Sequence, residues 1–199
     1  MGDGEPSAAP VEDAADTGKA PVPAPPITRT IVLVGLMGAG KTTIGRRLAA
    51  VIGLPFIDAD EEIERAAGLP VTEIFTRHGE QEFRRGERSV IKRLLEGPPH
   101  VLATGGGAFM DPETRALVRE KGLSVWLRED LDVLMRRVEK RDTRPLLRGG
   151  DPRAVMERLM AERYPVYAEA DVIVDSNNGP HNQAVTQVLE ALARREQPA

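Results

Sequence analysis

The 199-residue sequence contains no cysteine. This absence excludes disulfide bonds, thiolate zinc sites and cysteine nucleophiles, and it suits the reducing cytoplasm, where we expect the protein to act. No apolar run approaches the roughly 18 residues needed to span a bilayer. The acidic N-terminal segment also has no apolar stretch of the kind that a secretory signal requires. We therefore expect no membrane partner. The composition, with 41% hydrophobic and 29% charged residues, is typical of a globular fold.

The sequence has no excess of positive charge, since its formal net charge is −4. Residues 1–26 account for this value, because they contain five of the 31 acidic residues and one of the 27 basic residues. The 26 acidic and 26 basic residues that follow cancel. A neutral domain does not provide the broad positive field that nucleic-acid binding normally needs. We therefore expect no nucleic-acid partner.

Residues 1–26 differ from the rest of the chain in composition. They contain six prolines, many alanines and no aromatic residue. Such a segment cannot bury enough apolar surface to offset the entropy lost on ordering. We expect a disordered acidic tail over residues 1–26, followed by one domain over residues 27–199, which is long enough to bury a substantial core.

Short apolar runs alternate with longer amphipathic ones from residue 27 onward. Five of the short runs predict strands: residues 31–34, 55–57, 101–103, 124–127 and 172–174. Their β-branched residues and their lack of polar alternation favour strands that are covered on both faces. Alternating strands and helices predict an α/β fold, in which helices cover both faces of a parallel sheet.

Glycine and proline mark the expected helix boundaries. The periodic stretch 41–52 is followed directly by a glycine, which is a common helix terminator. Asp111-Pro112 and Asp151-Pro152 are each typical of an N-cap residue followed by proline at the first helical position.

A phosphate-binding loop is predicted between the first strand and the first helix. Residues 35–42 read Gly-Leu-Met-Gly-Ala-Gly-Lys-Thr, which matches G-x-x-x-x-G-K-[ST] in the context that the motif needs. Glycines let backbone N–H groups surround phosphate oxygens, and the helix N-terminus adds partial positive charge. Lys41 can bridge the β- and γ-phosphates of ATP, and the Thr42 hydroxyl is the expected ligand of Mg²⁺. The predicted nucleotide contacts are Gly38, Ala39, Gly40, Lys41, Thr42 and Thr43.

Two other interpretations of this loop are weaker. One is a glycine-rich turn with an unrelated lysine, but the flanking strand and helix argue against it. The other is a dinucleotide-binding fingerprint, whose third glycine would fall at Thr43.

Two carboxylates follow the second predicted strand. Asp58 and Asp60 stand two residues apart in Phe-Ile-Asp-Ala-Asp. At the carboxyl end of a strand near the phosphate loop, one acid can face Mg²⁺ and the other the substrate. Acids also favour the first turn of a helix, so the residues alone leave open a pair of solvated acids that begins a helix with Glu61 and Glu62.

From about Ile31 to about Leu192, the chain resembles the shikimate kinases. The segments that carry the resemblance are GLMGAGKTTIGRRLA at 35–49, FIDAD at 56–60, EIF at 73–75, GEQEFRRGE at 79–87, LATGGGA at 102–108, TRPLL at 143–147 and ERYPVYAEA at 162–170. The resemblance implies a three-layer α/β/α P-loop kinase with a five-stranded parallel sheet and a mobile lid at about 138–153. It also implies transfer of the γ-phosphoryl group of MgATP to the 3-hydroxyl of shikimate, in the pathway to chorismate and the aromatic amino acids.

The resemblance also implies residues that bind shikimate. Arg84 and Arg163 match the family's two carboxylate-binding arginines, and a planar guanidinium can grip a carboxylate with two hydrogen bonds. Glu87, three residues beyond Arg84, is on the same helix face and can hold it in place. The matching pocket lining is Gly105, Gly106, Gly107, Phe75 and Phe83.

Further matches concern catalysis and the nucleotide. Asp58 would hold Mg²⁺, and Asp60 would orient the acceptor hydroxyl and accept its proton. Arg144 matches the lid arginine that reaches the transferring phosphoryl group, so Lys41, Asp60 and Arg144 are the expected catalytic residues. Arg137 resembles the residue that stacks on adenine, although the neighbouring Arg136 is an alternative.

The sequence departs from the family pattern at two positions. Thr42 stands where serine is common, and Gly86 lies inside a predicted helix. Neither departure removes a functional group. The alternatives are a related kinase that acts on another carboxylated polyol such as gluconate, or a nucleotide-binding module without catalysis. We expect a monomer, because one compact domain encloses every predicted site residue.

Overall fold

The structure is a computed structural model that describes residues 27–139, 151–176 and 179–196. The predicted tail and most of the predicted lid, including Arg144, lie outside the described residues. No helix in the described ranges is both long enough and apolar enough to cross a membrane.

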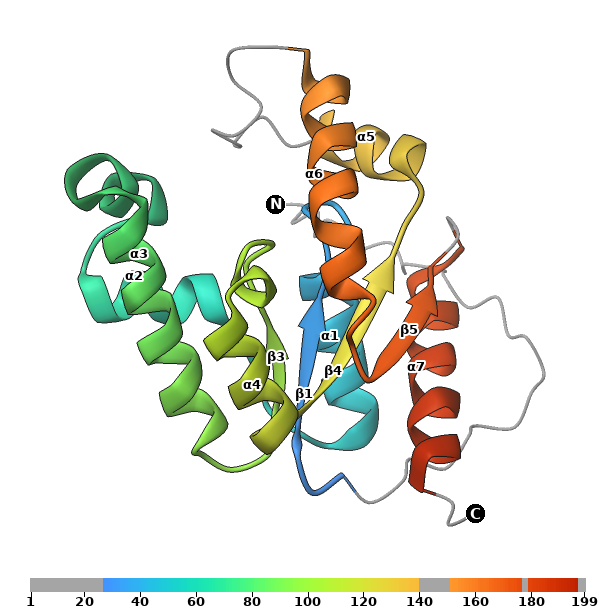
Figure 1. Cartoon of the computed structure of the whole chain (residues 1–199). Coiled ribbons are helices and arrows are strands. Elements are labelled where there is room, and N and C mark those ends of the chain that lie inside the picture. The colour runs from blue at the N-terminus through green and yellow to red at the C-terminus, as the bar shows by residue number, and fades with distance from the viewer. Residues whose placement is uncertain (1–26, 140–150, 177–178, 197–199) are drawn as a thin grey trace, which may run out of the picture.

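Five strands form one sheet, and all of its pairings are parallel. Across the sheet the order is β2 (Phe56–Asp58), β3 (Val101–Ala103), β1 (Thr30–Val34), β4 (Gly122–Arg128) and β5 (Val172–Asp175) (Figure 1). The predicted five-stranded parallel sheet is therefore confirmed. The strand order reverses at β1, because the chain places β2 and β3 on one side of it and β4 and β5 on the other.

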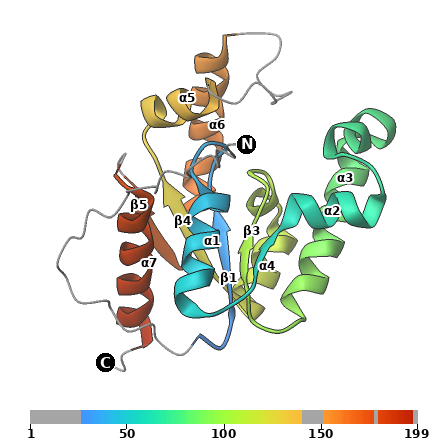
Figure 2. The ribbon, with the colours of Figure 1, turned by 180° about the vertical axis from the view of Figure 1, so that it is seen from behind.

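Helices cover both faces of the sheet, which confirms the predicted α/β fold. The helices α1 (Lys41–Ile52) and α7 (His181–Glu196) pack together on one face of the sheet, the face turned toward the viewer in Figure 2. On the opposite face lie α4 (Pro112–Lys121) and the C-terminal part of α6 (Pro152–Tyr167) (Figure 1). The remaining helices are α2 (Ala59–Ala67), α3 (Val71–Leu95), η1 (Ala108–Met110) and α5 (Leu131–Glu139).

The core is centred on β1, whose five residues are all buried. Burial on both faces explains why the central strands read as continuous apolar runs. The expectation is wrong for β5, in which Val172 and Val174 are buried but Ile173 is 42% exposed. β5 is at the edge of the sheet, where the helices cover only one of its faces fully.

The helix boundaries follow the predicted signals. α1 ends at Gly53, which has the left-handed conformation (φ 69°). Asp111 accepts a hydrogen bond from the Thr114 backbone N–H at 3.0 Å, and Asp151 accepts one from the Arg153 N–H at 2.9 Å. Both aspartates are therefore N-caps.

A smaller lobe formed by α2 and α3 stands beside the sheet (left in Figure 1). It has its own apolar cluster, built on Ile63, Ile74, Phe83 and Val90. α3 is kinked at Gly79, which has a non-helical backbone (φ 78°, ψ 172°). The lobe matters for function because α3 carries Phe83, Arg84 and Glu87 toward the carboxyl ends of the strands.

Two helical glycines provide a matched pair of stability tests. Gly86 has open space where a Cβ would lie, so Gly86→Ala should raise the free energy of unfolding by about 0.5–1 kcal/mol through helix propensity. A Cβ on Gly45 would come within 2.6 Å of the Phe56 ring and 2.9 Å of Leu33 Cδ1, since α1 packs closely on the sheet there. Gly45→Ala should therefore lower the free energy of unfolding by about 1–3 kcal/mol.

Urea unfolding of both variants and the wild type checks these values. Equal shifts of the same sign for the two alanines would contradict the close packing of α1 on the sheet.

Candidate active site

A cavity of about 680 Å³ opens at the carboxyl ends of the central strands. In open parallel sheets, ligands bind at this edge near the point where the strand order reverses. The predicted site residues that line the cavity are Gly38, Gly40, Lys41, Thr42, Thr43, Asp58, Asp60, Phe75, Phe83, Arg84, Gly105, Gly106, Gly107, Arg137 and Arg163. Ala39 is not among them, because its side chain is buried and its N–H donates to the Leu36 carbonyl at 3.2 Å.

The predicted phosphate loop connects β1 to α1. Gly38 and Gly40 both have positive φ values, 84° and 86°, which a residue with a side chain adopts at a cost. Gly40 is the N-cap of α1 and provides no side-chain cap. The first N–H groups of the helix therefore remain available to an anion at the cavity. Lys41 Nζ donates to the carbonyl oxygens of Gly35 at 2.7 Å and Leu36 at 3.0 Å, so it lies across the loop.

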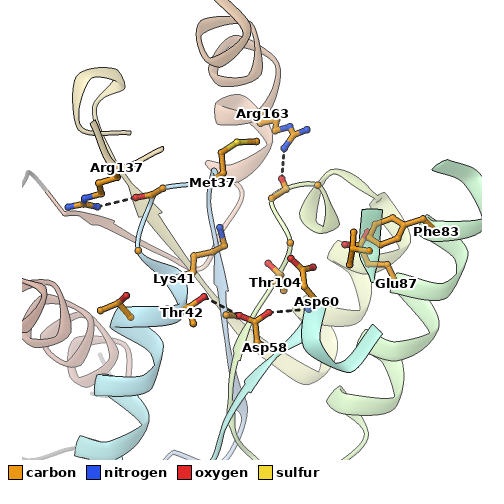
Figure 3. Close-up of a pocket in the computed structure, with 18 of the residues that line it drawn as sticks. Met37, Lys41, Thr42, Asp58, Asp60, Phe83, Glu87, Thr104, Arg137 and Arg163 are labelled. Carbon is orange, nitrogen blue, oxygen red and sulfur yellow. Dashed lines mark hydrogen bonds between the residues drawn. The ribbon is translucent and has the colours of Figure 1, made fainter. Parts of the chain in front are cut away.

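Asp58 links the phosphate loop to the strand β2. It accepts a hydrogen bond from the Thr42 hydroxyl at 3.0 Å and, through its other oxygen, one from the Asp60 N–H at 3.1 Å (Figure 3). Asp58 is also the N-cap of α2. The two acids therefore begin a helix and also line the cavity. In contrast, Glu61 pairs with Arg46 on the surface, outside the cavity.

Arg84 is held by a buried carboxylate. Its Nη1 donates to Glu87 Oε2 at 2.6 Å, which confirms the predicted contact within α3. Glu87 is 2% exposed, and its Oε1 has no hydrogen-bond partner among the described residues. Burial raises the pKa of Glu87, Arg84 opposes this shift, and Asp60 and Asp111 add to it. Although burial alone would lower the pKa of Arg84, Glu87 and Glu80 raise it overall, so the guanidinium stays charged.

The three glycines after β3 are surrounded by these charged groups. A Cβ at Gly105 would lie 3.0 Å from Asp60 Oδ1 and 3.1 Å from Glu87 Oε1. At Gly107 a Cβ would overlap the Arg84 guanidinium. The absence of side chains at these positions therefore lets charged groups from α2 and α3 reach the loop.

The second arginine comes from α6. Arg163 Nη1 donates to the Gly106 carbonyl at 2.9 Å (Figure 3), and the Tyr167 hydroxyl donates to the same oxygen. α6 continues through Pro165 to Tyr167, although proline commonly breaks a helix. Pro165 removes only its own N–H, and the Ala168 N–H still donates to the Tyr164 carbonyl at 2.9 Å.

An apolar wall completes the acceptor end of the cavity. The rings of Phe75 and Phe83 are in contact, with centroids 4.3 Å apart and planes tilted by 30°, and the Arg84 guanidinium lies 5.1 Å from the centre of the Phe83 ring. Phe83 also belongs to the apolar cluster of the α2–α3 lobe. It therefore serves both the core of the lobe and the cavity wall.

At the opposite end of the cavity, Arg137 lies against the phosphate loop. Its Nη1 donates to Glu129 Oε1 at 2.8 Å and to the Gly38 carbonyl at 3.2 Å. Arg136, the alternative nucleotide-contacting residue, is exposed and does not line the cavity.

Sequence reasoning missed several of the lining residues: Met37, Val71, Thr72, Ala103, Thr104 and His181. His181 is the first residue of α7. Burial lowers its pKa, as do Arg137 and Arg47. No spacing signal in the sequence connects His181 with these arginines, which come from α5 and α1.

Comparisons with known proteins agree with this geometry. A sequence model of the shikimate kinase family matches residues 37–193. The chain is 59% identical over 169 residues to a shikimate kinase of Caulobacter vibrioides, covering 85% of this chain and 84% of that protein. It is 58% identical over 166 residues to one of Paramagnetospirillum magneticum, covering 83% and 85%.

Solved structures give the same result. The shikimate kinase of Acinetobacter baumannii in complex with shikimate superimposes with a TM-score of 0.82 and 35% identity, over 86% of this chain and 96% of that one. A gluconokinase of Sinorhizobium meliloti is 24% identical with a TM-score of 0.58, over 84% and 93%, which shows a shared fold alone. With this family match and these identities, the chain belongs to the shikimate kinase family, whose members are ATP-dependent kinases.

Proposed function

We propose that this protein transfers the γ-phosphoryl group of ATP to the 3-hydroxyl of shikimate, giving shikimate 3-phosphate and ADP on the route to the aromatic amino acids. One observation carries the proposal: a single cavity has a phosphate loop with two carboxylates at one end and two arginines at the other. This arrangement suits a nucleotide and a small carboxylated alcohol bound side by side.

The nucleotide end would act through charge and position. Phosphoryl transfer asks little covalent chemistry of the protein, so alignment and electrostatic stabilisation provide most of the rate. Backbone N–H groups at the start of α1 and the Lys41 ammonium would surround the β- and γ-phosphates. Arg144, which lies outside the described residues, is proposed to add a further cation when the predicted lid closes over the site.

The residues present fit a magnesium ion. The Thr42 hydroxyl and the Asp58 carboxylate lie 3.0 Å apart and are both hard oxygen donors at the phosphate loop. Among the described residues no cluster of three or more acidic, histidine or cysteine ligands competes with them. Mg²⁺ takes few protein ligands and completes its shell with phosphate and water oxygens. When bound, it would neutralise charge on the ATP phosphates.

The acceptor end would set the position of shikimate. Arg84 and Arg163 would bind its carboxylate, and the Gly105–Gly107 loop and the two phenylalanines would enclose its ring. Asp60 would orient the 3-hydroxyl and take its proton as the oxygen bonds to the γ-phosphorus. The bond from that phosphorus to the β-phosphate bridging oxygen breaks, and ADP leaves. Binding energy far from the reacting oxygen thus fixes the geometry of transfer.

We also propose that the enzyme works as a cytoplasmic monomer without a nucleic-acid or membrane partner. Support comes from the balanced charge after residue 26 and from a cavity whose described lining belongs to one chain. The reaction also consumes ATP, a cytoplasmic metabolite.

The acceptor is tested by ADP release from MgATP with shikimate, gluconate, quinate or no addition. We expect stimulation by shikimate alone, and ³¹P and ¹H NMR of the product should show a phosphate on the ring 3-oxygen. Stimulation by gluconate instead would change the acceptor and keep the kinase mechanism. ATP binding without stimulation by any acceptor would favour a non-catalytic module.

The carboxylate clamp is tested by Arg84→Lys. Lysine keeps the charge but cannot form two parallel hydrogen bonds, so KM for shikimate should rise at least about tenfold while KM for ATP stays within about twofold. Arg85→Lys is the matched control, because Arg85 is the next residue, is 79% exposed and pairs with Glu82 on the surface. Equal KM values for shikimate in both variants would contradict the clamp.

The raised pKa of Glu87 predicts a pH-dependent stability. The folded protein holds the Glu87 proton more tightly than the unfolded chain, whose ordinary pKa is 4.5. The stability from neutral Glu87 is therefore complete below that value and is lost as the pH rises through the raised pKa. Glu87→Gln removes this loss, so the free energy of unfolding of the variant should increase relative to that of the wild type as the pH rises from 4.5 through the raised pKa.

Denaturant unfolding across this pH range measures the difference between the two curves. Parallel curves would show that Glu87 does not titrate as described. Above the raised pKa of Glu87 the variant should also bind shikimate more weakly, because Arg84 then lacks the charged partner that it has in the wild type.

A further inference from the structure

Glu129 is a second buried carboxylate near the cavity, and the proposed mechanism does not use it. It follows β4 directly, and its side chain is 0% exposed. Oε1 accepts the hydrogen bond from Arg137, whereas Oε2 is buried without a hydrogen-bond partner among the described residues. A buried carboxylate is costly unless a cation compensates it. Arg137 is the cation that compensates Glu129.

Arg137 connects Glu129 to the phosphate loop. The same Nη1 that donates to Glu129 also donates to the Gly38 carbonyl, and Figure 3 draws this second hydrogen bond. α5 packs directly on this part of the loop, since a Cβ at Gly38 would come within 3.1 Å of Val138 Cγ2 and 3.2 Å of the Leu134 carbonyl. The guanidinium is therefore fixed between a buried carboxylate and the backbone of the loop that would bind the phosphates.

The backbone of Glu129 is also held in place. Its backbone carbonyl accepts a hydrogen bond from the Tyr164 hydroxyl at 2.6 Å. Burial raises the pKa of Tyr164 to about 12, so the hydroxyl remains a donor at neutral pH. This hydrogen bond helps to fix the backbone from which the Glu129 carboxylate reaches Arg137.

Arg137 and Arg47 are both cations near this end of the cavity. Arg137 and His181 line it, and Arg47 of α1 lies close enough to lower the pKa of His181. The lowered pKa keeps His181 uncharged near pH 7, and the Arg137 side chain is 25% exposed, so burial does not prevent its release toward solvent. The Glu129 carboxylate opposes this release, because it is the group to which Arg137 is ion-paired.

We propose that Glu129 is a positioning residue for the nucleotide end of the cavity. Its carboxylate holds Arg137 against the Gly38 carbonyl, so that the loop and the guanidinium are already arranged when the nucleotide arrives. Ordering these groups in advance improves affinity, because the entropy of ordering is not lost on binding. This inference rests on the proposed function for the identity of the nucleotide.

Calorimetric binding of MgADP and, separately, of shikimate to the full-length protein tests the role. Glu129→Gln keeps the shape and one acceptor but removes the charge, so the Kd for MgADP should rise about tenfold and the Kd for shikimate should stay within about twofold. The matched control is Asp171→Asn, because Asp171 also pairs with an arginine, Arg195, but lies outside the cavity. Its two Kd values should equal those of the wild type.

Arg137 provides a second test that does not depend on the folding of the Glu129 variant. Arg137→Lys keeps a cation but loses the forked donor, and its Kd for MgADP should rise by a similar factor. In the Glu129→Gln, Arg137→Lys double variant the increase in Kd for MgADP should be smaller than the product of the two single increases. Both changes remove the same contact, the one between Glu129 and Arg137.

The outcomes separate this inference from the proposed function. Wild-type affinity for MgADP in both single variants would overturn the positioning role alone. Equal weakening of MgADP and shikimate binding would also overturn it, because a general loss of structure would explain both. A wild-type protein that binds no MgADP would overturn the inference and the proposed function together.

Discussion

The parallel pairing of β1 with both β3 and β4 determines where the functional loops meet. Ile31 pairs with Val101 and with Leu123, and the same register continues to the carboxyl end of β1. The segments that follow these strands therefore emerge at one edge of the sheet. The phosphate loop, the two acids at the junction of β2 and α2 and the glycine loop after β3 all line one cavity as a result.

Two buried carboxylates place arginines at opposite ends of that cavity. Glu87 holds Arg84 at the acceptor end, and Glu129 holds Arg137 at the nucleotide end. In each pair one carboxylate oxygen has no hydrogen-bond partner among the described residues. Each pair thus combines a desolvated acid with a partly exposed cation, an arrangement that fixes the guanidinium direction at a cost in stability.

Local patterns were sufficient for much of this arrangement. The phosphate loop follows from contiguous residues, and the Glu87–Arg84 contact follows from spacing within one helix. The roles of Glu129 and His181 could not be predicted in this way, because their partners come from other elements and depend on tertiary packing. Ile173 shows the same limit. Its exposure follows from the position of β5 at the edge of the sheet, which depends on the spatial order of the strands.

The central claim is that Arg84 and Arg163 bind a carboxylate and so place the hydroxyl at Asp60. The most direct measurement compares kcat/KM for shikimate with that for an analogue in which hydrogen replaces the carboxylate. The account predicts a loss of at least about a thousandfold in the wild type, because the arginines would be left without a partner. It also predicts a smaller loss in Arg84→Lys. Similar kcat/KM values for the two substrates in the wild type would contradict the account.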